Sequence, residues 1–496
     1  MKINEKSFFL KEYKIVLGYV GVLTMIIGLI TLIPLIILLA FPEEMKYALN
    51  FIIASLTAII LGYILKGNID INQKYKLSLS QDAVIVVFTW LIACLFSSIP
   101  WILSGQLNFT QAYFESVSGW TTTGLSVIDI PSTPNIYLFH RSITLFFGGV
   151  GLVLVMVSAL SATFGLRLYN SEGHSDRLLP NLLKSSRLIM SIYAGYILAG
   201  TLLYIFFGMN WFHAINNSIA SVSTGGFGMT NNSIGEYNSI AIELITIILM
   251  ILGSTNFAAN MLLLKKESIK DFFKQSEWKF SWFLLGIAIP LIAFSSLKLL
   301  FESTSEVLRI AIFQTVSALT TTGFSTVSFN NWGSFPMLIL IILMIVGGGT
   351  NSTAGGMKQY RVYLMLKNFL WELRKKFKSN HLVNEDYYIK PDGKTFIQSI
   401  HITEAANYAY IYIITLFIGT LVLCFHGYSL QDSLFEFASA LGTVGLSIGI
   451  TTATAPPVVL WVEIIGMLFG RLEIYVFFIV AIKIYLDIKK QIFAKK

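Results

Sequence analysis

Four short segments of this chain share a threonine that is followed two residues later by glycine. Aligned on that glycine, they read FESVSGWTTTGLS from residue 114, NNSIASVSTGGFG from 216, FQTVSALTTTGFS from 313 and FEFASALGTVGLS from 435. In all four, a threonine stands two residues before the glycine and a leucine or phenylalanine follows it. A single segment of this kind would be an ordinary turn that caps a short helix. Four of them at the same place in four units form an internal repeat, which indicates a shared role.

These segments suit a pathway for a cation. Each offers roughly ten residues of helix before it turns polar, which is too short to cross hydrocarbon, and non-helical backbone at that depth must line a cavity or lie inside protein. The carboxyl end of each helix directs a negative dipole at the place where the segments meet. Glycine tolerates unusual dihedral angles and adds no obstructing side chain. We therefore expect the four segments to surround one axis with backbone carbonyl oxygens.

The composition is that of a membrane protein. Of 496 residues, 55% are hydrophobic and 12% are charged, and the mean hydropathy is +0.70. Each stretch without acidic or basic side chains is long enough for a spanning helix of about 20 residues: 15–40, 83–114, 142–166, 188–235, 310–357, 405–431 and 437–462. The stretches 188–235 and 310–357 are too long for one span and too short for three, as expected where a half-span follows a full one.

The net charge of +8 is unevenly distributed. Lysine and arginine gather in alternate connections, near residues 66–76, 167–187, 265–274, 374–378 and 483–496. This positive-inside asymmetry places the basic connections and both termini in the cytoplasm and argues against nucleic acid as a partner. The apolar run from residue 15 exceeds the core of a signal peptide, about 7–15 residues, so we expect it to be a retained helix.

The predicted fold is an all-α polytopic membrane protein. Two helices, 15–40 and 47–65, precede four pseudo-symmetric repeats, each a helix, a re-entrant half-span and a second helix around one pore. The first helices are expected at 81–103, 186–208, 280–300 and 403–426, and the second helices at 136–165, 237–264, 334–366 and 457–486. This gives ten spans and four half-spans. The expected boundaries are 1–76 for the two extra helices, then 77–185, 186–279, 280–401 (with the gating loop and a cytoplasmic linker) and 402–496 (with a cytoplasmic tail).

A second constellation of small residues interrupts the second helix of the third repeat. So many glycines and small polar residues break a helix, although the flanks are strongly apolar. We favour an unwound loop inside the membrane that acts as a gate, and a kinked, tightly packed helix is the alternative. Its residues are Gly347, Gly348, Gly349, Thr350, Asn351, Ser352, Thr353, Ala354, Gly355 and Gly356.

Charges inside the predicted spans are few, and such charges are usually functional. Arg471 either faces the pore and forms an electrostatic barrier with the loop, or pairs with Glu473 or snorkels to the cytoplasmic surface. Glu115 and Glu436 recur at one position of the half-spans and are expected at the outer, wet end, where they either attract cations or are simply solvated. His213 is expected to start a half-span helix. No arrangement of residues suggests catalysis, so the chain is not expected to be an enzyme.

The four half-spans, the loop 347–356 and the Gly470-Arg471-Leu472-Glu473 end together resemble the Trk/Ktr/HKT superfamily of potassium transporters. The resemblance covers essentially the whole chain, and the two extra N-terminal helices and the length are similar to its TrkH/TrkG branch. It implies a homodimer with one pore per subunit, potassium as the transported ion and no cofactor in this chain. It also implies a bacterial cytoplasmic (inner) membrane location among lipid, and a TrkA-like cytoplasmic regulatory subunit that binds NAD or ATP.

In that family the selectivity filter is built from the repeat glycine and the two residues before it. Carried over to this chain, the potassium-binding filter residues are Thr122, Thr123, Gly124, Thr224, Gly225, Gly226, Thr321, Thr322, Gly323, Thr443, Val444 and Gly445. The resemblance also assigns the gate to the loop 347–356 and the pore arginine to Arg471. Plant relatives with serine at the first filter glycine transport sodium, so Gly124 favours potassium. Because the second and fourth segments read Thr-Gly-Gly and Thr-Val-Gly, side-chain support of the filter is expected to differ between repeats.

Other functions remain open at this stage. A sodium- or proton-coupled potassium symporter would need an ionisable or second ion site near the midplane, for which the sequence offers few candidates. A membrane enzyme would need a His/Asp/Glu cluster at one face, and none is found. A sensor without ion flux would be recognised by its failure to restore growth at low potassium.

Overall fold

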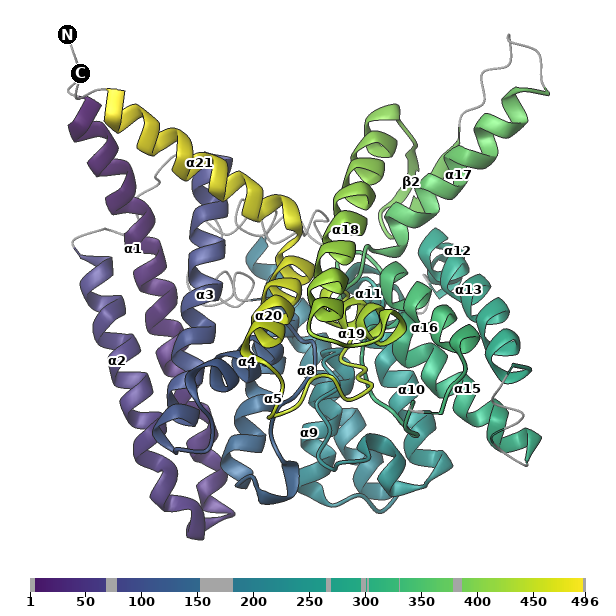
Figure 1. Cartoon of the computed structure of the whole chain (residues 1–496), viewed down its shortest axis with the longest axis horizontal. Coiled ribbons are helices and arrows are strands. Elements are labelled where there is room, and N and C mark those ends of the chain that lie inside the picture. Colours follow the sequence, from purple (N-terminus) through teal and green to yellow (C-terminus); the bar gives the residue numbers. More distant parts are fainter. Residues whose placement is uncertain are drawn as a thin grey trace. The chain divides into compact units, whose positions relative to one another are not determined.

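A computed structural model of the chain describes residues 5–67, 78–151, 182–264, 269–295, 300, 303–329, 331–377 and 386–493 (Figure 1). Within these ranges, helices dominate and one small antiparallel sheet occurs. The chain divides into two compact units. The terminal unit comprises Met1–Trp120, Ser132–Leu188 and Leu472–Lys496, and the central unit comprises Thr121–Pro131 and Ile189–Arg471.

The terminal unit is a helical bundle in which small residues allow close packing. α1 and α2 cross in contact, because a Cβ added at Gly21 would lie 2.6 Å from the carbonyl oxygen of Gly62, and one at Gly62 equally close to that of Gly21. Such glycine contacts replace the hydrophobic driving force that helices lack in lipid. The elements are α1 (Glu5–Leu32), η1 (Ile33–Leu39), η2 (Pro42–Tyr47), α2 (Ala48–Lys66), α3 (Leu79–Leu103), α4 (Phe109–Trp120), α5 (Asn135–Val150) and α21 (Ile474–Phe493).

The central unit holds the remaining repeats and most of α8. Its elements are α8 (Leu182–Phe206), α9 (Trp211–Val222), η4 (Ser233–Tyr237), α10 (Ile240–Ser254), α11 (Phe257–Leu264), α12 (Ile269–Lys274), α13 (Ser276–Ala293), α15 (Thr304–Leu319), α16 (Ser334–Val346), α17 (Gln359–Lys375), β1 (Tyr387–Lys390), β2 (Gly393–Phe396), α18 (Ser399–Phe425), α19 (Leu430–Leu441) and α20 (Pro457–Leu472). β1 and β2 form a hairpin in which Tyr387 faces Phe396 and Lys390 faces Gly393.

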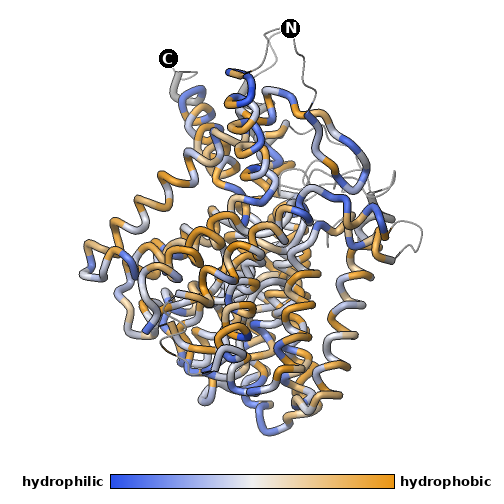
Figure 2. Tube along the Cα trace, turned by 90° about the vertical axis from the view of Figure 1, so that its right-hand side faces the viewer, coloured by the Kyte–Doolittle hydropathy of each residue, from blue (hydrophilic) through white to orange (hydrophobic). Residues whose placement is uncertain are grey.

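Among the described residues, five helices are long and apolar enough to cross a membrane: 13–39, 42–66, 79–103, 186–206 and 399–425. Hydrophobic residues run along the helices, and hydrophilic residues gather in connecting segments (Figure 2). The predicted first helices coincide with α3, α8 and α18 to within four residues at each end, whereas α13 begins four residues and ends seven residues before the predicted 280–300. The second helix of the first repeat, predicted to residue 165, lies outside the described residues beyond 151, so the total of ten spans stays a prediction.

Two predicted second helices, 237–264 and 457–486, are not continuous, and in this respect the sequence-based prediction was wrong, whereas the third, 334–366, is interrupted as predicted. α10 and α11 are bent by 119° where Thr255 and Asn256 separate them, and the Asn256 side chain accepts a hydrogen bond from the N–H of Ala258. α16 ends at Val346, and α17 begins only at Gln359. α20 ends at Leu472, where Glu473 takes a left-handed φ of 62°. At these breaks, polar side chains and glycines allow the backbone N–H and C=O groups to form hydrogen bonds outside a regular helix.

Candidate functional site

Each repeat contains one short helix that ends four residues before its repeat glycine. We use the name repeat glycines for Gly124, Gly226, Gly323 and Gly445. The short helices α4, α9, α15 and α19 have 12, 12, 16 and 12 residues. At 1.5 Å per residue they span roughly 18–24 Å, less than the hydrocarbon thickness of about 30 Å. The side chains of Asn210 and Ser429 cap the starts of α9 and α19.

The backbone after each short helix adopts the same unusual conformation. The threonine two residues before each repeat glycine is left-handed, with φ of 54°, 51°, 54° and 48° at Thr122, Thr224, Thr321 and Thr443. The repeat glycines themselves have φ of 90°, 58°, 84° and 94°. A β-branched residue in this region is an outlier that costs about 1–3 kcal/mol and persists only where its surroundings hold it. The sequence predicts the backbone freedom of the repeat glycines, but it does not predict the strained, left-handed backbone of the four threonines.

The repeat glycines contact the neighbouring segments in a closed cycle. A Cβ added at Gly124 would overlap the carbonyl oxygen of Gly225, and one at Gly226 would overlap that of Thr322. In the same way, a Cβ at Gly323 would overlap the carbonyl of Val444, and one at Gly445 would overlap that of Thr123. Each segment thus touches the next, and the fourth touches the first. We call the twelve residues of these segments the ring: 122–124, 224–226, 321–323 and 443–445.

Side-chain support of the ring alternates between repeats. The hydroxyls of Thr121 and Thr123 lie 2.8 Å apart, and so do those of Thr320 and Thr322. In the second and fourth repeats this pair cannot form, because Gly225 and Val444 carry no hydroxyl. The fourth repeat uses Ser439 instead, whose Oγ accepts a hydrogen bond of 3.0 Å from the N–H of Gly445. The predicted difference between repeats is therefore confirmed at the level of hydrogen bonding.

Glycines on the second helices bring those helices against the short helices, a feature that the sequence reasoning missed. A Cβ at Gly148 would overlap the carbonyl oxygen of Trp120, one at Gly253 that of Val222, and one at Gly470 that of Leu441. Each of these carbonyls belongs to the last residue of a short helix. The signal in the sequence was a glycine 24 to 27 residues after the repeat glycine, which occurs in all four repeats.

Glu115 and Glu436 are buried rather than wet, so their predicted exposure was wrong. Their exposed fractions are 1% and 0%. Glu115 forms an ion pair with Arg141 of α5, with 2.9 Å between Oε1 and Nε. Glu436 accepts hydrogen bonds from the hydroxyls of Ser447 and Thr451 at 2.6 Å each, and from two backbone N–H groups of the segment after the fourth ring position. A buried carboxylate needs such partners, and both glutamates thereby tie a short helix to its surroundings.

Arg141→Ala is expected to lower the free energy of unfolding by about 3–5 kcal/mol, because it leaves the buried charge of Glu115 without its ion-pair partner. The measurement is the midpoint of thermal unfolding of the purified protein in detergent. Arg309→Ala is the matched control, since Arg309 also pairs with a glutamate, Glu243, but its side chain is 29% exposed. Equal shifts for the two variants would contradict the prediction.

The segment 347–358 is unwound, as the sequence predicts, and it lies against the ring. Gly347 and Gly356 take φ of 70° and 76°, which only glycine adopts readily. The Thr353 hydroxyl lies 3.1 Å from that of Thr224, and the N–H of Gly355 donates to the Thr321 hydroxyl at 2.7 Å. A Cβ at Gly355 would also overlap the hydroxyl oxygen of Thr443. The loop therefore touches the strained threonines of three repeats.

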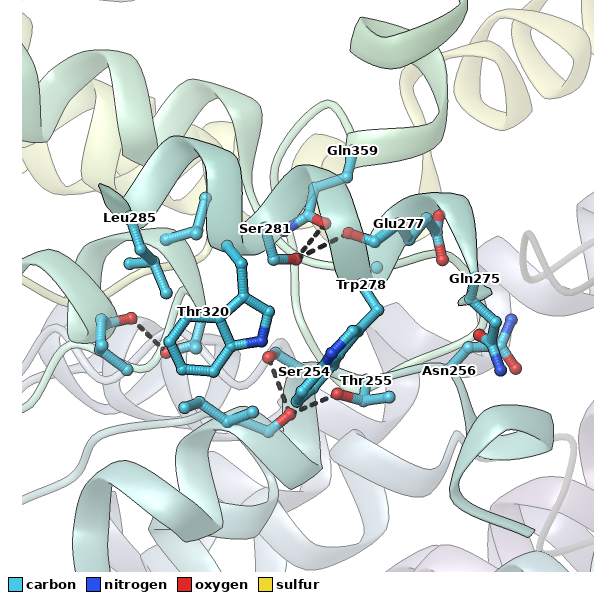
Figure 3. Close-up of a pocket in the computed structure, with 15 residues that line it drawn as sticks. Ser254, Thr255, Asn256, Gln275, Glu277, Trp278, Ser281, Leu285, Thr320 and Gln359 are labelled. Carbon is cyan, nitrogen blue, oxygen red and sulfur yellow. Dashed lines mark hydrogen bonds between the residues drawn. The ribbon is translucent and has the colours of Figure 1, made fainter. Parts of the chain in front are cut away.

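The first residues of the loop are anchored by polar side chains of α13 and α17. Glu277 Oε1 accepts hydrogen bonds from the N–H and the hydroxyl of Thr350 at 3.0 and 2.9 Å. Gln359 donates to the carbonyl of Gly347 at 3.1 Å and accepts from the hydroxyl of Ser281 at 2.6 Å. Glu277, Ser281 and Gln359 line a cavity of about 40 Å³ (Figure 3). Sequence reasoning had assigned no role to Glu277 or Gln359.

Arg471 lies at the end of α20 and contacts the loop directly. Its Nη1 donates a hydrogen bond of 2.9 Å to the carbonyl oxygen of Thr353. That same threonine contacts Thr224 of the ring. The structure thus brings the predicted pore arginine and the predicted gating loop together.

Two histidines have local polar partners. His213 lies in the first turn of α9, as predicted, with Nδ1 2.9 Å from the Tyr237 hydroxyl. His140 is buried and lies 3.1 Å from the carbonyl oxygen of Ser97. Cys94 and Cys424 are free thiols. Across the described ranges, no group of three or more His, Cys, Asp or Glu side chains is placed to hold a metal ion.

Comparison with known proteins assigns the family. Residues 48–488 match the family model described as TrkH, cation transport protein. The chain belongs to the TrkH family of cation transport proteins. The resemblance inferred from the repeats is thereby confirmed, and with it the multi-pass helical membrane fold.

Individual relatives agree with this assignment. The chain is 31% identical over 468 residues to an uncharacterized cation transporter of Methanocaldococcus jannaschii, covering 94% of each. It is 29% identical to the Trk system potassium uptake protein TrkH of Halomonas elongata, covering 93% of this chain and 97% of the relative. The crystal structure of the potassium transporter TrkH from Vibrio parahaemolyticus superposes with a TM-score of 0.82 at 25% identity, covering 94% of this chain and 98% of that one. These relatives are cation transporters rather than enzymes.

Proposed function

We propose that this chain takes up potassium ions through a gated, channel-like pore whose selectivity filter is the ring. The observation that carries the proposal is the closed cycle of contacts between repeat glycines and neighbouring carbonyls. Backbone carbonyls that replace an ion's hydration shell are the usual means of potassium selectivity. The hydroxyl of Thr122 is buried without a hydrogen-bond partner among the described residues, which suits an oxygen atom that faces an ion or its water.

Potassium is favoured over other cations by two further facts. Relatives that match over most of this chain are named as potassium uptake proteins. The first repeat glycine is Gly124 rather than serine. Potassium is the transported ion in this proposal, and the chain itself carries no cofactor.

The gate of the proposed pore is the loop 347–356 together with Arg471. The loop contacts the ring threonines of three repeats, and Arg471 adds a positive charge and a hydrogen bond at Thr353. A guanidinium next to the ring repels a cation that leaves it. Flux then requires that the loop and Arg471 separate from the ring.

The surroundings of the proposed pore follow from the charge distribution and the family. By the positive-inside rule we expect both termini in the cytoplasm, and we propose a bacterial cytoplasmic (inner) membrane as the location. We propose a homodimer with one pore per subunit, embedded in lipid. A TrkA-like, nucleotide-binding regulatory subunit would contact the basic cytoplasmic connections, including 371–378, where α17 ends in Arg374 and Lys375.

Growth at low potassium of a bacterium that lacks its own potassium uptake tests the proposal. The wild-type chain is expected to restore growth, and Gly124→Ser is expected to lower K⁺/Na⁺ discrimination in flux measurements roughly tenfold, about 1.4 kcal/mol, because the new side chain displaces the carbonyl of Gly225. Gly427→Ser is the matched control, since Gly427 has a similar φ of 93° but open space around it. Absence of rescue by wild type, or unchanged selectivity in Gly124→Ser, would contradict the proposal.

A sodium- or proton-coupled potassium symporter is the second candidate, and one observation favours it. Glu463 of α20 and Glu436 are both fully buried and share the hydroxyl of Thr451, with 3.1 Å and 2.6 Å to the oxygens. Ionisable residues inside a membrane often mark coupling sites. Coupling predicts that the reversal potential for potassium shifts with pH or sodium, and that Glu463→Gln abolishes the shift. An unresponsive reversal potential supports the uncoupled pore.

A further inference from the structure

The first turn of α13 joins the intramembrane loop to the cytoplasmic hairpin β1–β2. Ser276 is the first residue of α13, and its Oγ accepts a hydrogen bond of 3.0 Å from the N–H of Ile389 in β1. The next residue, Glu277, accepts the two hydrogen bonds from Thr350 of the loop. Two adjacent residues of one helical turn therefore contact the hairpin and the loop. Ser276 is 7% and Glu277 is 9% exposed.

The hairpin also packs on the helix that leaves the loop. Tyr388 of β1 is buried, and its ring centroid lies 4.9 Å from that of Tyr360 and 5.6 Å from that of Tyr363, both in α17. Tyr363 in turn contacts Phe280 of α13 at 5.7 Å. Lys367 of α17 donates to the carbonyl of Tyr387 at 2.8 Å. The hairpin is thus fastened to both helices that hold the loop.

The anchor at Glu277 is strong and also open to competition by water. Hydrogen bonds to a charged acceptor are roughly twice as strong as neutral ones, and Thr350 supplies two of them. Gly349 lies close to the same carboxylate, since an added Cβ would be 3.2 Å from Glu277 Oε2. The cavity beside Glu277, about 40 Å³, has room for water between Glu277, Ser281 and Gln359 (Figure 3). Water that binds the carboxylate would replace the Thr350 hydrogen bonds.

We propose that Glu277 is the positioning residue that holds the intramembrane loop against the ring, and that the hairpin β1–β2 controls this hold through Ser276. Movement of the hairpin tilts the first turn of α13, withdraws the carboxylate from Thr350 and frees the loop. The inference deepens the proposed function, because it rests on the loop being the gate. Coupling between the hairpin and the loop is tested by a direct measurement of the interaction between Ser276 and Glu277.

The experiment measures exposure of the loop without reference to ion flux. Ser352 is 2% exposed within the loop, so Ser352→Cys reports loop opening through its rate of reaction with a thiol reagent. The full-length purified protein carries Cys94→Ala and Cys424→Ala as background. Glu277→Ala is expected to raise the labelling rate roughly tenfold, because two charge-assisted hydrogen bonds are lost. Glu277→Gln, whose amide oxygen still accepts from Thr350 but carries no charge, is expected to give a rate between those of the parent and Glu277→Ala.

Coupling to the hairpin is measured in the same assay. Ser276→Ala is expected to give an intermediate rate, and the double variant is expected to match Glu277→Ala alone, because both changes act on one contact. Glu404→Ala and Ser399→Ala, exposed residues of the first turns of α18, serve as controls and should leave the rate unchanged. Parental labelling in Glu277→Ala, or equal rates for Glu277→Gln and Glu277→Ala, would overturn the role of Glu277. Rates that multiply in the double variant would overturn the control by the hairpin.

Potassium flux through the same variants separates this inference from the proposed function. Faster labelling together with raised basal flux supports both. Faster labelling with unchanged flux supports the anchor at Glu277 and contradicts the assignment of the loop as the gate.

Discussion

Gly226→Ala is expected to abolish potassium uptake. The new methyl group would overlap the carbonyl oxygen of Thr322, a ring oxygen of the next repeat. Neither partner can move freely, because Gly226 is already left-handed at 58° and Thr321 is held in a strained conformation. Overpacking of this kind typically costs about 1–3 kcal/mol, and here the displaced atom is itself a proposed ion ligand. The measurement is potassium or rubidium flux into liposomes that contain the purified variant.

The matched control separates backbone strain from overlap in the ring. Gly67 has a similar φ of 52°, and its nearest neighbour to an added Cβ is 4.0 Å away. Gly67→Ala therefore also places an alanine at a positive φ, without the collision, and it should retain flux. Normal flux in Gly226→Ala, or a loss of flux shared by both variants, would show that the ring does not conduct.

Removal of the contact between Arg471 and the loop is expected to raise basal flux by roughly tenfold. Arg471→Ala loses a charge-assisted hydrogen bond to the carbonyl of Thr353, worth about 1.5–3 kcal/mol, and it removes a positive charge from the proposed pathway. If this contact favours the closed loop, the open fraction rises by the same free energy. The measurement is the open probability, or the initial rate of rubidium flux, in the absence of any cytoplasmic partner.

Two further variants sharpen this test. A chain shortened within 348–355 removes the contacts to Thr224 and Thr321 and should raise flux at least as much as Arg471→Ala. Arg374→Ala removes an exposed arginine near the end of α17 and should leave flux unchanged. Wild-type open probability in both Arg471→Ala and the shortened chain would rule out the loop as the gate.

Much of the architecture follows from local patterns. The short helices end where the hydroxyl residues begin, because a segment of about 12 residues cannot span the bilayer and threonine and glycine do not continue a helix well. The run from Gly347 to Gly356 is unwound for the same reason. These features depend on residue type and spacing over one or two helical turns. The occurrence of the same pattern in four repeats strengthens the prediction for each of them.

Other features depend on which distant segments meet, and no local pattern encodes them. Glu115 looked like an outer, hydrated residue, yet it pairs with Arg141, which follows it by 26 positions on another helix. Glu277 looked like an ordinary acidic residue at a helix start, yet it accepts two hydrogen bonds from Thr350. The second helices of the second and fourth repeats looked continuous because their hydropathy is high throughout. Their breaks are stabilised by tertiary hydrogen bonds such as that from Arg471 to Thr353.

The sequence by itself determined the membrane class, the fourfold repeat, the four glycines and the unwound loop. All of these arise from composition and from short-range preferences that repeat along the chain. Only the tertiary structure decided that each repeat glycine meets the carbonyl of the next repeat, that three ring threonines contact the loop, and that α13 connects this loop to the hairpin. The physical reason is that these contacts join segments that are far apart in the chain, and their geometry is set by close packing of glycine backbones and by satisfaction of buried polar groups.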